Sequence, residues 1–169
     1  MEMKKEKGFT LVEILAAVGI LGIIAVIGSG MFFSILRGST KTKTLQLVKQ
    51  NGDYAISVME RMIRNARALI SPTSDGQVNS ITIQNPDGGT TTFSCEGVPA
   101  TISSNSASLL SSEVKVSSDC NIFEVTVGQA GIKPGAIKIN FSLSQSRATA
   151  RPEEQASVNF QTTVSLRNY

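Results

Sequence analysis

The hydrophobic pattern changes twice along the N-terminal part of the chain. A short charged leader, residues 1–8, is followed by an apolar run from Phe9 to Leu36 in which Glu13 is the only charge. The run holds about 28 residues, more than the roughly 20 that a helix needs to cross a bilayer. About 16 of them are Leu, Ile, Val or Phe, which favour insertion by about 5–10 kcal/mol, while one carboxylate costs a few kcal/mol. The pattern therefore predicts a transmembrane helix despite Glu13.

Beyond residues 37–40 the apolar positions recur every three or four residues, which is typical of an amphipathic helix. We expect one helix from Phe9 to about Ile70, ended by Ser71-Pro72 because proline cannot continue a helix. Its charged side chains fall on or near the face opposite the apolar stripe. The stripe, which should pack on a sheet, consists of Leu45, Val48, Gly52, Ala55, Ile56, Met59, Met62, Ile63, Ala66 and Ile70.

The rest of the chain alternates between apolar and polar residues in short stretches, which is typical of strands. The turn residues Asn85-Pro86-Asp87-Gly88-Gly89 favour a hairpin between the first two. The Ser-rich stretch 96–118 is ambiguous, with 107–110 as one candidate short element, and 144–156 is expected to be a polar loop. The expected strands are 80–84, 90–95, 121–127, 136–144 and 158–166.

A sheet with one apolar face needs a cover, and the helical stripe is the only good candidate. The predicted fold is therefore α+β: a long N-terminal helix, transmembrane in its first half, packed by its second half on a mostly antiparallel β-sheet. Four segments follow from this pattern: a leader (1–8), a transmembrane half of the helix (9–38), an amphipathic half (39–70) and a β-rich domain (71–169).

Glu13 calls for a partner, because an ionisable residue within a membrane helix is read as functional by default. If the chain is cut after Gly8, Phe9 carries a free amine at a helix N-terminus, where a carboxylate in the first turn complements the helix dipole. Glu13 lies four residues on, on the same helical face and about 6 Å along the axis. Its carboxylate can pair with this ammonium or with that of a neighbouring subunit.

The stretch Lys7-Gly8-Phe9-Thr10-Leu11-Val12-Glu13 resembles the prepilin cleavage and methylation motif of type IV pilins and type II secretion pseudopilins. The resemblance implies that a prepilin peptidase cuts between Gly8 and Phe9 and N-methylates Phe9, and that Glu13 guides subunits into a filament. Residues 58–66 resemble, more loosely, the end of the same helix in J-type minor pseudopilins and W-type minor pilins. A structural subunit of the minor class is the implied function.

The same resemblance implies the partners and the location of the protein. Other pilin or pseudopilin subunits, prepilin peptidase and, before assembly, membrane lipid are the implied partners. The leader would be cytoplasmic and the C-terminal domain extracytoplasmic, with a single pass through the cytoplasmic membrane before entry into a type IV pilus or type II pseudopilus. Charge alone does not decide this orientation, because Lys4, Lys5 and Lys7 before the span are balanced by Arg37, Lys41 and Lys43 after it.

Several alternatives stay open at this stage. An ordinary signal peptide would be cut after its apolar part, where Gly28-Ser29-Gly30 is a poor site. A plain membrane anchor or a filament-tip module that binds a secreted substrate, a surface or DNA are further possibilities. Gly19, Gly22, Gly28 and Gly30 either allow local unwinding in a filament or let helices pack closely.

Two cysteines, Cys95 and Cys120, stand far apart in a chain without histidine. A metal site needs more ligands than these two. An extracytoplasmic disulfide is the natural interpretation, and two unpaired buried thiols are the alternative. We therefore expect a disulfide and no metal site.

Little in the sequence indicates chemistry. The absence of histidine removes Ser-His and Cys-His catalytic pairs, and no phosphate-binding loop occurs, so no enzymatic activity and no cofactor are expected. Major pseudopilins often bind calcium near the C-terminus, but only Glu153-Glu154 offers carboxylates there. A net charge of +3 is too weak to imply nucleic-acid binding, and the Arg-rich helix face is more typical of a solvated surface.

Overall fold

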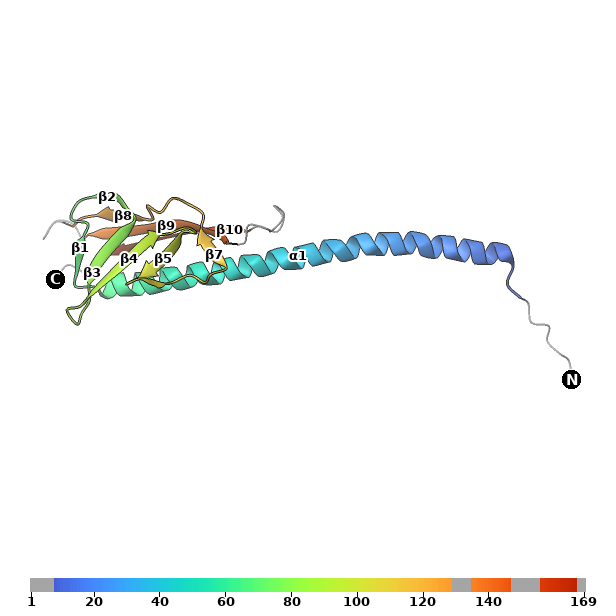
Figure 1. The fold of residues 1–169 in the computed structure, drawn as a ribbon, viewed down its shortest axis with the longest axis horizontal. Helices are drawn as coiled ribbons and strands as arrows, with labels where there is room; N and C mark the ends of the chain where they lie inside the picture. The colour runs from blue at the N-terminus through green and yellow to red at the C-terminus, as the bar shows by residue number, and fades with distance from the viewer. Residues whose placement is uncertain (1–7, 129–134, 147–155, 167–169) are drawn as a thin grey trace. The chain divides into compact units, whose positions relative to one another are not determined.

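The computed structural model describes residues 8–128, 135–146 and 156–166. The chain divides into two compact units, Met1–Thr40 and Lys41–Tyr169, which are described separately here. One helix, α1 (Leu11–Asn65), belongs to both (Figure 1). The expectation of a long N-terminal helix is confirmed, although the helix begins at Leu11 rather than at Phe9.

The first unit consists of the N-terminal part of α1, and all of its described residues, 8–40, are exposed. Its large apolar side chains include Phe9, which is 82% exposed, and Leu36, which is 47% exposed. No described side chain of this unit is buried, so its apolar surface is left uncovered by the described residues.

The described residues of the second unit form ten strands in two sheets, and all the pairings are antiparallel. The first sheet has the order β1-β3-β4-β5-β6, and the second has the order β10-β9-β8-β2 with β7 paired to β9. The strands are β1 (Ala68–Ser71), β2 (Gly76–Val78), β3 (Ser80–Gln84), β4 (Thr90–Glu96), β5 (Thr101–Ser104), β6 (Ala107–Ser108), β7 (Val114–Val116), β8 (Phe123–Thr126), β9 (Ala136–Gln145) and β10 (Ser157–Ser165).

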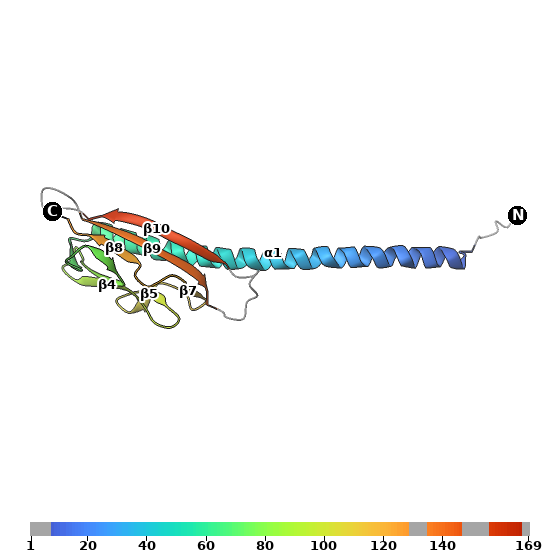
Figure 2. The same ribbon diagram turned by 90° about the horizontal axis from the view of Figure 1, so that it is seen from above.

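The core of the second unit lies between the two sheets and the Lys41–Asn65 part of α1 (Figures 1 and 2). The helix contributes fully buried side chains at every third or fourth position, among them Ala55, Met59 and Ile63. The helix and β10 approach so closely that a Cβ at Gly52 would lie 2.1 Å from Cζ of Phe160. The ring of Phe160 stacks on Phe141 with centroids 5.5 Å apart, so a side chain at position 52 would force this ring to shift against its neighbour. The expected packing of the helical stripe on a sheet is confirmed.

The predicted stripe is wrong at its two ends, where the side chains are exposed rather than buried. Leu45 is 44% exposed, and Ile70 is 43% exposed and lies in β1. The helix ends at Asn65, before the predicted stop at Ser71-Pro72, because the following backbone pairs with a strand. The amide of Arg67 donates to the carbonyl of Gln84 at 2.9 Å, and β1 then continues the ladder along β3.

The clearest alternation patterns are confirmed as strands. The structure has β3, β4, β8, β9 and β10 within one or two residues of the ranges expected. The ambiguous stretch 96–118 contains β5, β6 and β7, of which only β6 lies within the candidate element 107–110. The short strands β1 and β2 were not expected, and the strands form two sheets rather than one.

Candidate functional site

The N-terminus of α1 is closed by a reciprocal hydrogen-bonded cap. The backbone amide of Glu13 donates to the hydroxyl oxygen of Thr10 at 3.3 Å, and the amide and hydroxyl of Thr10 each donate to Oε2 of Glu13 at 3.1 Å. This is the capping box, in which a Thr at the N-cap and a Glu three residues on satisfy each other's free amides. Glu13 therefore has a structural partner in its own chain as well as a favourable position near the positive end of the helix dipole.

Thr10 is the residue of this site to which the sequence analysis gave no role. The signal was present, because Thr-x-x-Glu directly before an apolar run is the sequence signature of a capping box. The sequence analysis predicted only an ammonium group as the partner of Glu13. That pairing involves an amine that exists only after cleavage, since Phe9 follows Gly8 through a peptide bond in the chain described here.

Gly8 and Phe9 precede the helix in an open stretch and are exposed. A Cβ at Gly8 would meet no heavy atom within 4 Å, and the backbone of Gly8 does not occupy the left-handed region. Neither space nor backbone conformation in the described chain therefore requires glycine at this position. The bond between Gly8 and Phe9 is accessible on the surface of the unit.

The apolar side chains that follow the cap cover the whole circumference of α1. The 18-residue window that marks the span has a mean hydropathy of 2.6, and none of it is buried. Among the described residues α1 is the one helix long and apolar enough to cross a membrane. A signal sequence can have the same length and composition. The capped carboxylate of Glu13 at the start of α1 has no role in a signal sequence and therefore favours a pilin-like helix.

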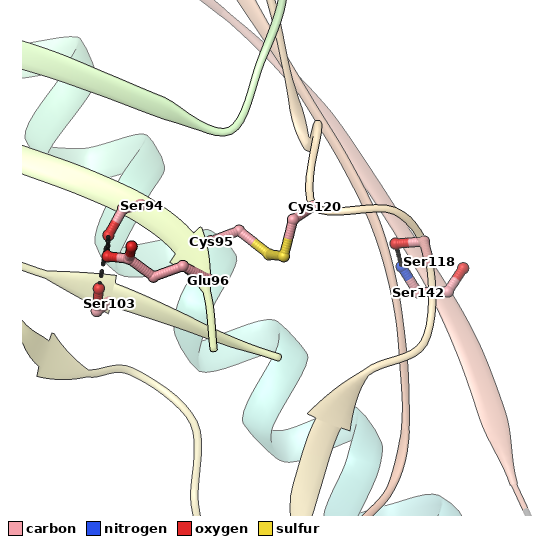
Figure 3. The surroundings of a disulfide bond; sticks show 7 residues. All are labelled: Ser94, Cys95, Glu96, Ser103, Ser118, Cys120 and Ser142. Carbon is pink, nitrogen blue, oxygen red and sulfur yellow. Dashed lines mark hydrogen bonds between the residues drawn. A yellow bond between two sulfur atoms is a disulfide. The ribbon is translucent and has the colours of Figure 1, made fainter. Parts of the chain in front are cut away.

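The disulfide lies in the second unit and joins its two sheets (Figure 3). Cys95, in β4 of the first sheet, is bonded to Cys120, which lies shortly before β8 of the second sheet. Hydrogen bonds on either side fix the same region: the Ser94 and Ser103 hydroxyls are 2.9 Å apart, and the amide of Ser142 donates to the Ser118 hydroxyl at 3.2 Å. The predicted disulfide is confirmed.

The described residues contain no group of three or more His, Cys, Asp or Glu side chains placed to hold a metal ion. Glu153-Glu154, the pair considered for calcium, lies outside the described residues. The sites that the sequence singled out thus fall in two places: Gly8, Phe9 and Glu13 in the first unit, and Cys95 with Cys120 in the second.

Comparison with known proteins bears on the first of these places. Residues 3–29 match the prokaryotic N-terminal methylation motif, so the match spans most of the leader, the capped acid and about three quarters of the apolar run. No curated protein and no solved structure matches the chain significantly. The motif, together with a long apolar helix and antiparallel sheets in one chain, supports a subunit of the type IV pilin and pseudopilin type, and the helix is one candidate membrane span among the described residues.

Proposed function

We propose that this chain is a structural subunit, of the minor class, that is processed by prepilin peptidase and assembled into a type IV pilus or type II pseudopilus. The observation that carries the proposal is the exposed apolar surface from Phe9 to Leu36 with one capped carboxylate near its start. Exposure of such an apolar surface to water is unfavourable. Lipid covers the surface before assembly, and the equivalent helices of other subunits cover it afterwards.

Processing is proposed to occur between Gly8 and Phe9, followed by N-methylation of Phe9. The support is the family match over this segment and the accessibility of the bond. Because the chain's own fold places no steric demand on Gly8, the demand for glycine comes from the processing enzyme. Gly8→Leu should therefore block cleavage without changing the stability of the folded domain, whereas Gly8→Ala should be cleaved more slowly.

Glu13 is proposed to pair with the amine of Phe9 on a neighbouring subunit. The cap uses Oε2 of Glu13, and within the described residues Oε1 accepts no hydrogen bond. Oε1 is therefore free to accept from an ammonium of another chain, and a charged pair is strongly favoured in an apolar filament interior because the unpaired alternatives are costly there. Glu13 would thus set the axial register between subunits.

The test separates cleavage from assembly. Glu13→Ala and Glu13→Gln are expressed with prepilin peptidase and the filament machinery, and both the mature N-terminus and the filament fraction are measured. Both variants should begin at methylated Phe9, while incorporation falls at least tenfold. Glu13→Gln keeps an acceptor for the cap but lacks the charge, so it distinguishes the ion pair from capping. Wild-type incorporation of Glu13→Gln would contradict the proposed pairing.

An uncleaved membrane anchor is the principal competitor. It predicts that the protein keeps residues 1–8 when the peptidase is present. Mass analysis of the protein purified from membranes decides between the two, with loss of residues 1–8 and gain of one methyl group as the result expected for a pilin subunit.

A further inference from the structure

In the part of the chain that the structure describes, one edge of the second sheet is unpaired along its full length. β10 pairs with β9 over nine consecutive residue pairs without a bulge, and the other side of β10 has no strand partner among the described residues. In Figure 2 this outer edge lies along the upper side of the second unit. An open edge of this kind is a template for adding another strand, and most proteins protect such edges.

The other edges of the two sheets are short or protected. β1 has 4 residues, contains a bulge and is followed by Pro72, while β6 has 2 residues. β2 has 3 residues, and β7 has 3 residues including Lys115. β10 has 9 residues, Ser-Val-Asn-Phe-Gln-Thr-Thr-Val-Ser, without a charge or a proline. Of the described edges, only β10 is therefore long, regular and uncharged.

The hydrogen bonds show which groups of β10 face outward. Beyond the end of β10, the amide of Leu166 donates to the carbonyl of Gly135, on the β9 side. Since backbone direction alternates along a strand, the even-numbered residues of β10 bond to β9 and the odd-numbered ones point away. The amide of Asn140, opposite Gln161, donates to Ile122 on the far side of β9, in agreement with this alternation. The amides and carbonyls that face outward belong to Ser157, Asn159, Gln161, Thr163 and Ser165.

The two ends of β10 are symmetric about Gln161, while the inner positions 159 and 163, and 160 and 162, carry different residues. In an antiparallel pair of two such strands centred there, Ser157 lies opposite Ser165 and Val158 opposite Val164 of the second copy. Every outward-facing residue then meets an outward-facing residue, so five residue pairs can each exchange two backbone hydrogen bonds. Phe160 meets Thr162 on the inner face, and no like charges are brought together.

We propose that β10 is a homotypic docking edge, which joins the β domains of two copies of this chain by antiparallel strand pairing centred on Gln161. The pairing joins copies of opposite polarity. In Figure 2, β10 runs in the same direction as the Lys41–Asn65 part of α1, and a two-fold axis at Gln161 reverses both. The contact is therefore not one between neighbouring subunits of a single filament. The strand pairing itself does not depend on the function proposed above; if that function holds, the pairing links copies carried by two filaments or by two facing surfaces.

Cysteine cross-linking of the full chain in detergent micelles tests the register. The two native cysteines are bonded to each other, so an added cysteine is the one free thiol. In Gln161→Cys the two Cα atoms would lie about 5.5 Å apart across the two-fold axis, within the range for a disulfide. In the matched control Ser157→Cys, the two thiols are separated by roughly 27 Å, eight residues at about 3.4 Å each.

The proposal predicts a covalent dimer of Gln161→Cys under mild oxidation, at least tenfold more abundant than that of Ser157→Cys. The double variant Ser157→Cys/Ser165→Cys should cross-link as well as Gln161→Cys. Equal cross-linking of Gln161→Cys and Ser157→Cys would overturn the proposal, because association through the apolar helix or random collision does not select one register. An absence of dimer in all three variants would overturn it too.

Proline substitution tests the edge without a new thiol. Gln161→Pro removes an outward amide and leaves the bonds to β9 in place, as proline is tolerated on an edge facing solvent. It should abolish dimerisation measured by sedimentation while the unfolding midpoint stays near that of the wild type. Thr162→Pro removes a bond to β9 and should lower the midpoint. Dimerisation of Gln161→Pro at the wild-type level would contradict the proposal.

Discussion

The two halves of α1 belong to one helix and have opposite relations to the rest of the chain. From Leu11 to Thr40 every residue is exposed, and the apolar side chains surround the helix. From Lys41 to Asn65 the apolar side chains form a stripe, and the stripe is buried by the chain's own sheets. The same backbone geometry therefore serves two roles, and the arrangement of apolar residues around the axis decides which one.

The difference in burial indicates where each half of α1 obtains its stability. The second half contributes to the folding of the β domain, because its burial is complete within one chain. The described residues of the first half are all exposed, so this half should add little to that folding; under the proposed function it gains its stability from lipid or from other subunits. Substitutions in the two halves should accordingly separate into effects on domain stability and effects on insertion or assembly.

A matched pair of methionines gives the largest expected contrast. Met59 is completely buried, whereas Met31 is 65% exposed. Met59→Ala should destabilise the domain by about 2–5 kcal/mol, since it removes packed atoms and leaves a cavity, and Met31→Ala should change the same free energy of unfolding by less than about 0.5 kcal/mol. Denaturant unfolding in micelles, followed by the fluorescence of a tyrosine or a label in the β domain, measures both. Similar effects of the two variants on the free energy of unfolding would contradict the proposed difference between the two halves of α1.

The disulfide should stabilise only the second unit. Cys95 and Cys120 are 25 residues apart in sequence, and closing a loop of this size is worth about 3–4 kcal/mol in the chain-entropy model. Cys95→Ser/Cys120→Ser should lower the stability of the β domain by about this amount and leave membrane insertion unchanged. Addition of a reductant should destabilise the wild type and have no effect on the double variant.

Glycine substitutions sharpen the contrast between the halves. Gly52→Ala forces a methyl group into the ring of Phe160 and should cost about 1–3 kcal/mol of domain stability, as overpacking does. Gly30→Ala meets no heavy atom within 4 Å and should leave domain stability unchanged, while increasing helix propensity by about 1 kcal/mol. Partial rescue of Gly52→Ala by Phe160→Leu would tie the loss to this contact, and an absence of rescue would assign it elsewhere.

The smallest expected effect concerns the helix cap. Thr10→Ala removes the hydroxyl that accepts from the amide of Glu13 and should weaken the helix start by about 1 kcal/mol. Faster amide exchange over residues 11–14 in micelles would report this fraying, with unchanged exchange in the Lys41–Asn65 part of α1. Thr10→Ser retains a hydroxyl and should behave like the wild type. Equal amide exchange in Thr10→Ala and the wild type would show that the Thr10 hydroxyl does not stabilise the start of the helix.

Much of the fold was predictable because the strong periodic patterns are local. The strict alternation in β3 and β9 needs only a buried face to become a strand, and the stripe through Val48, Ala55 and Met59 needs only a sheet to cover it. The end of α1 was not predictable in this way. Residues 66–70 continue the helical spacing, and only the pairing of β1 with β3, a contact between distant parts of the chain, draws them into a strand.

The candidate site shows the same division between local and distant information. The motif around Gly8, Phe9 and Glu13 is contiguous and could be recognised directly, and Thr10 could have been included from its spacing to Glu13. The partner sheets of Cys95 and Cys120 could not be assigned, since the pairing order of strands in the Ser-rich stretch 96–118 depends on tertiary contacts. The close contact between Gly52 and Phe160 could not be predicted from the sequence either, because it joins residues far apart in the chain.

Thiol accessibility in the assembled state tests the central claim most directly. Ile24→Cys in the first half of α1 and Ser57→Cys in the second half both place a thiol at a position exposed in the single chain. A membrane-impermeant maleimide should label Ser57→Cys in intact filaments or membranes and should fail to label Ile24→Cys until the sample is denatured. Equal labelling of the two thiols in the intact state would show that the first half has no partner beyond its own chain.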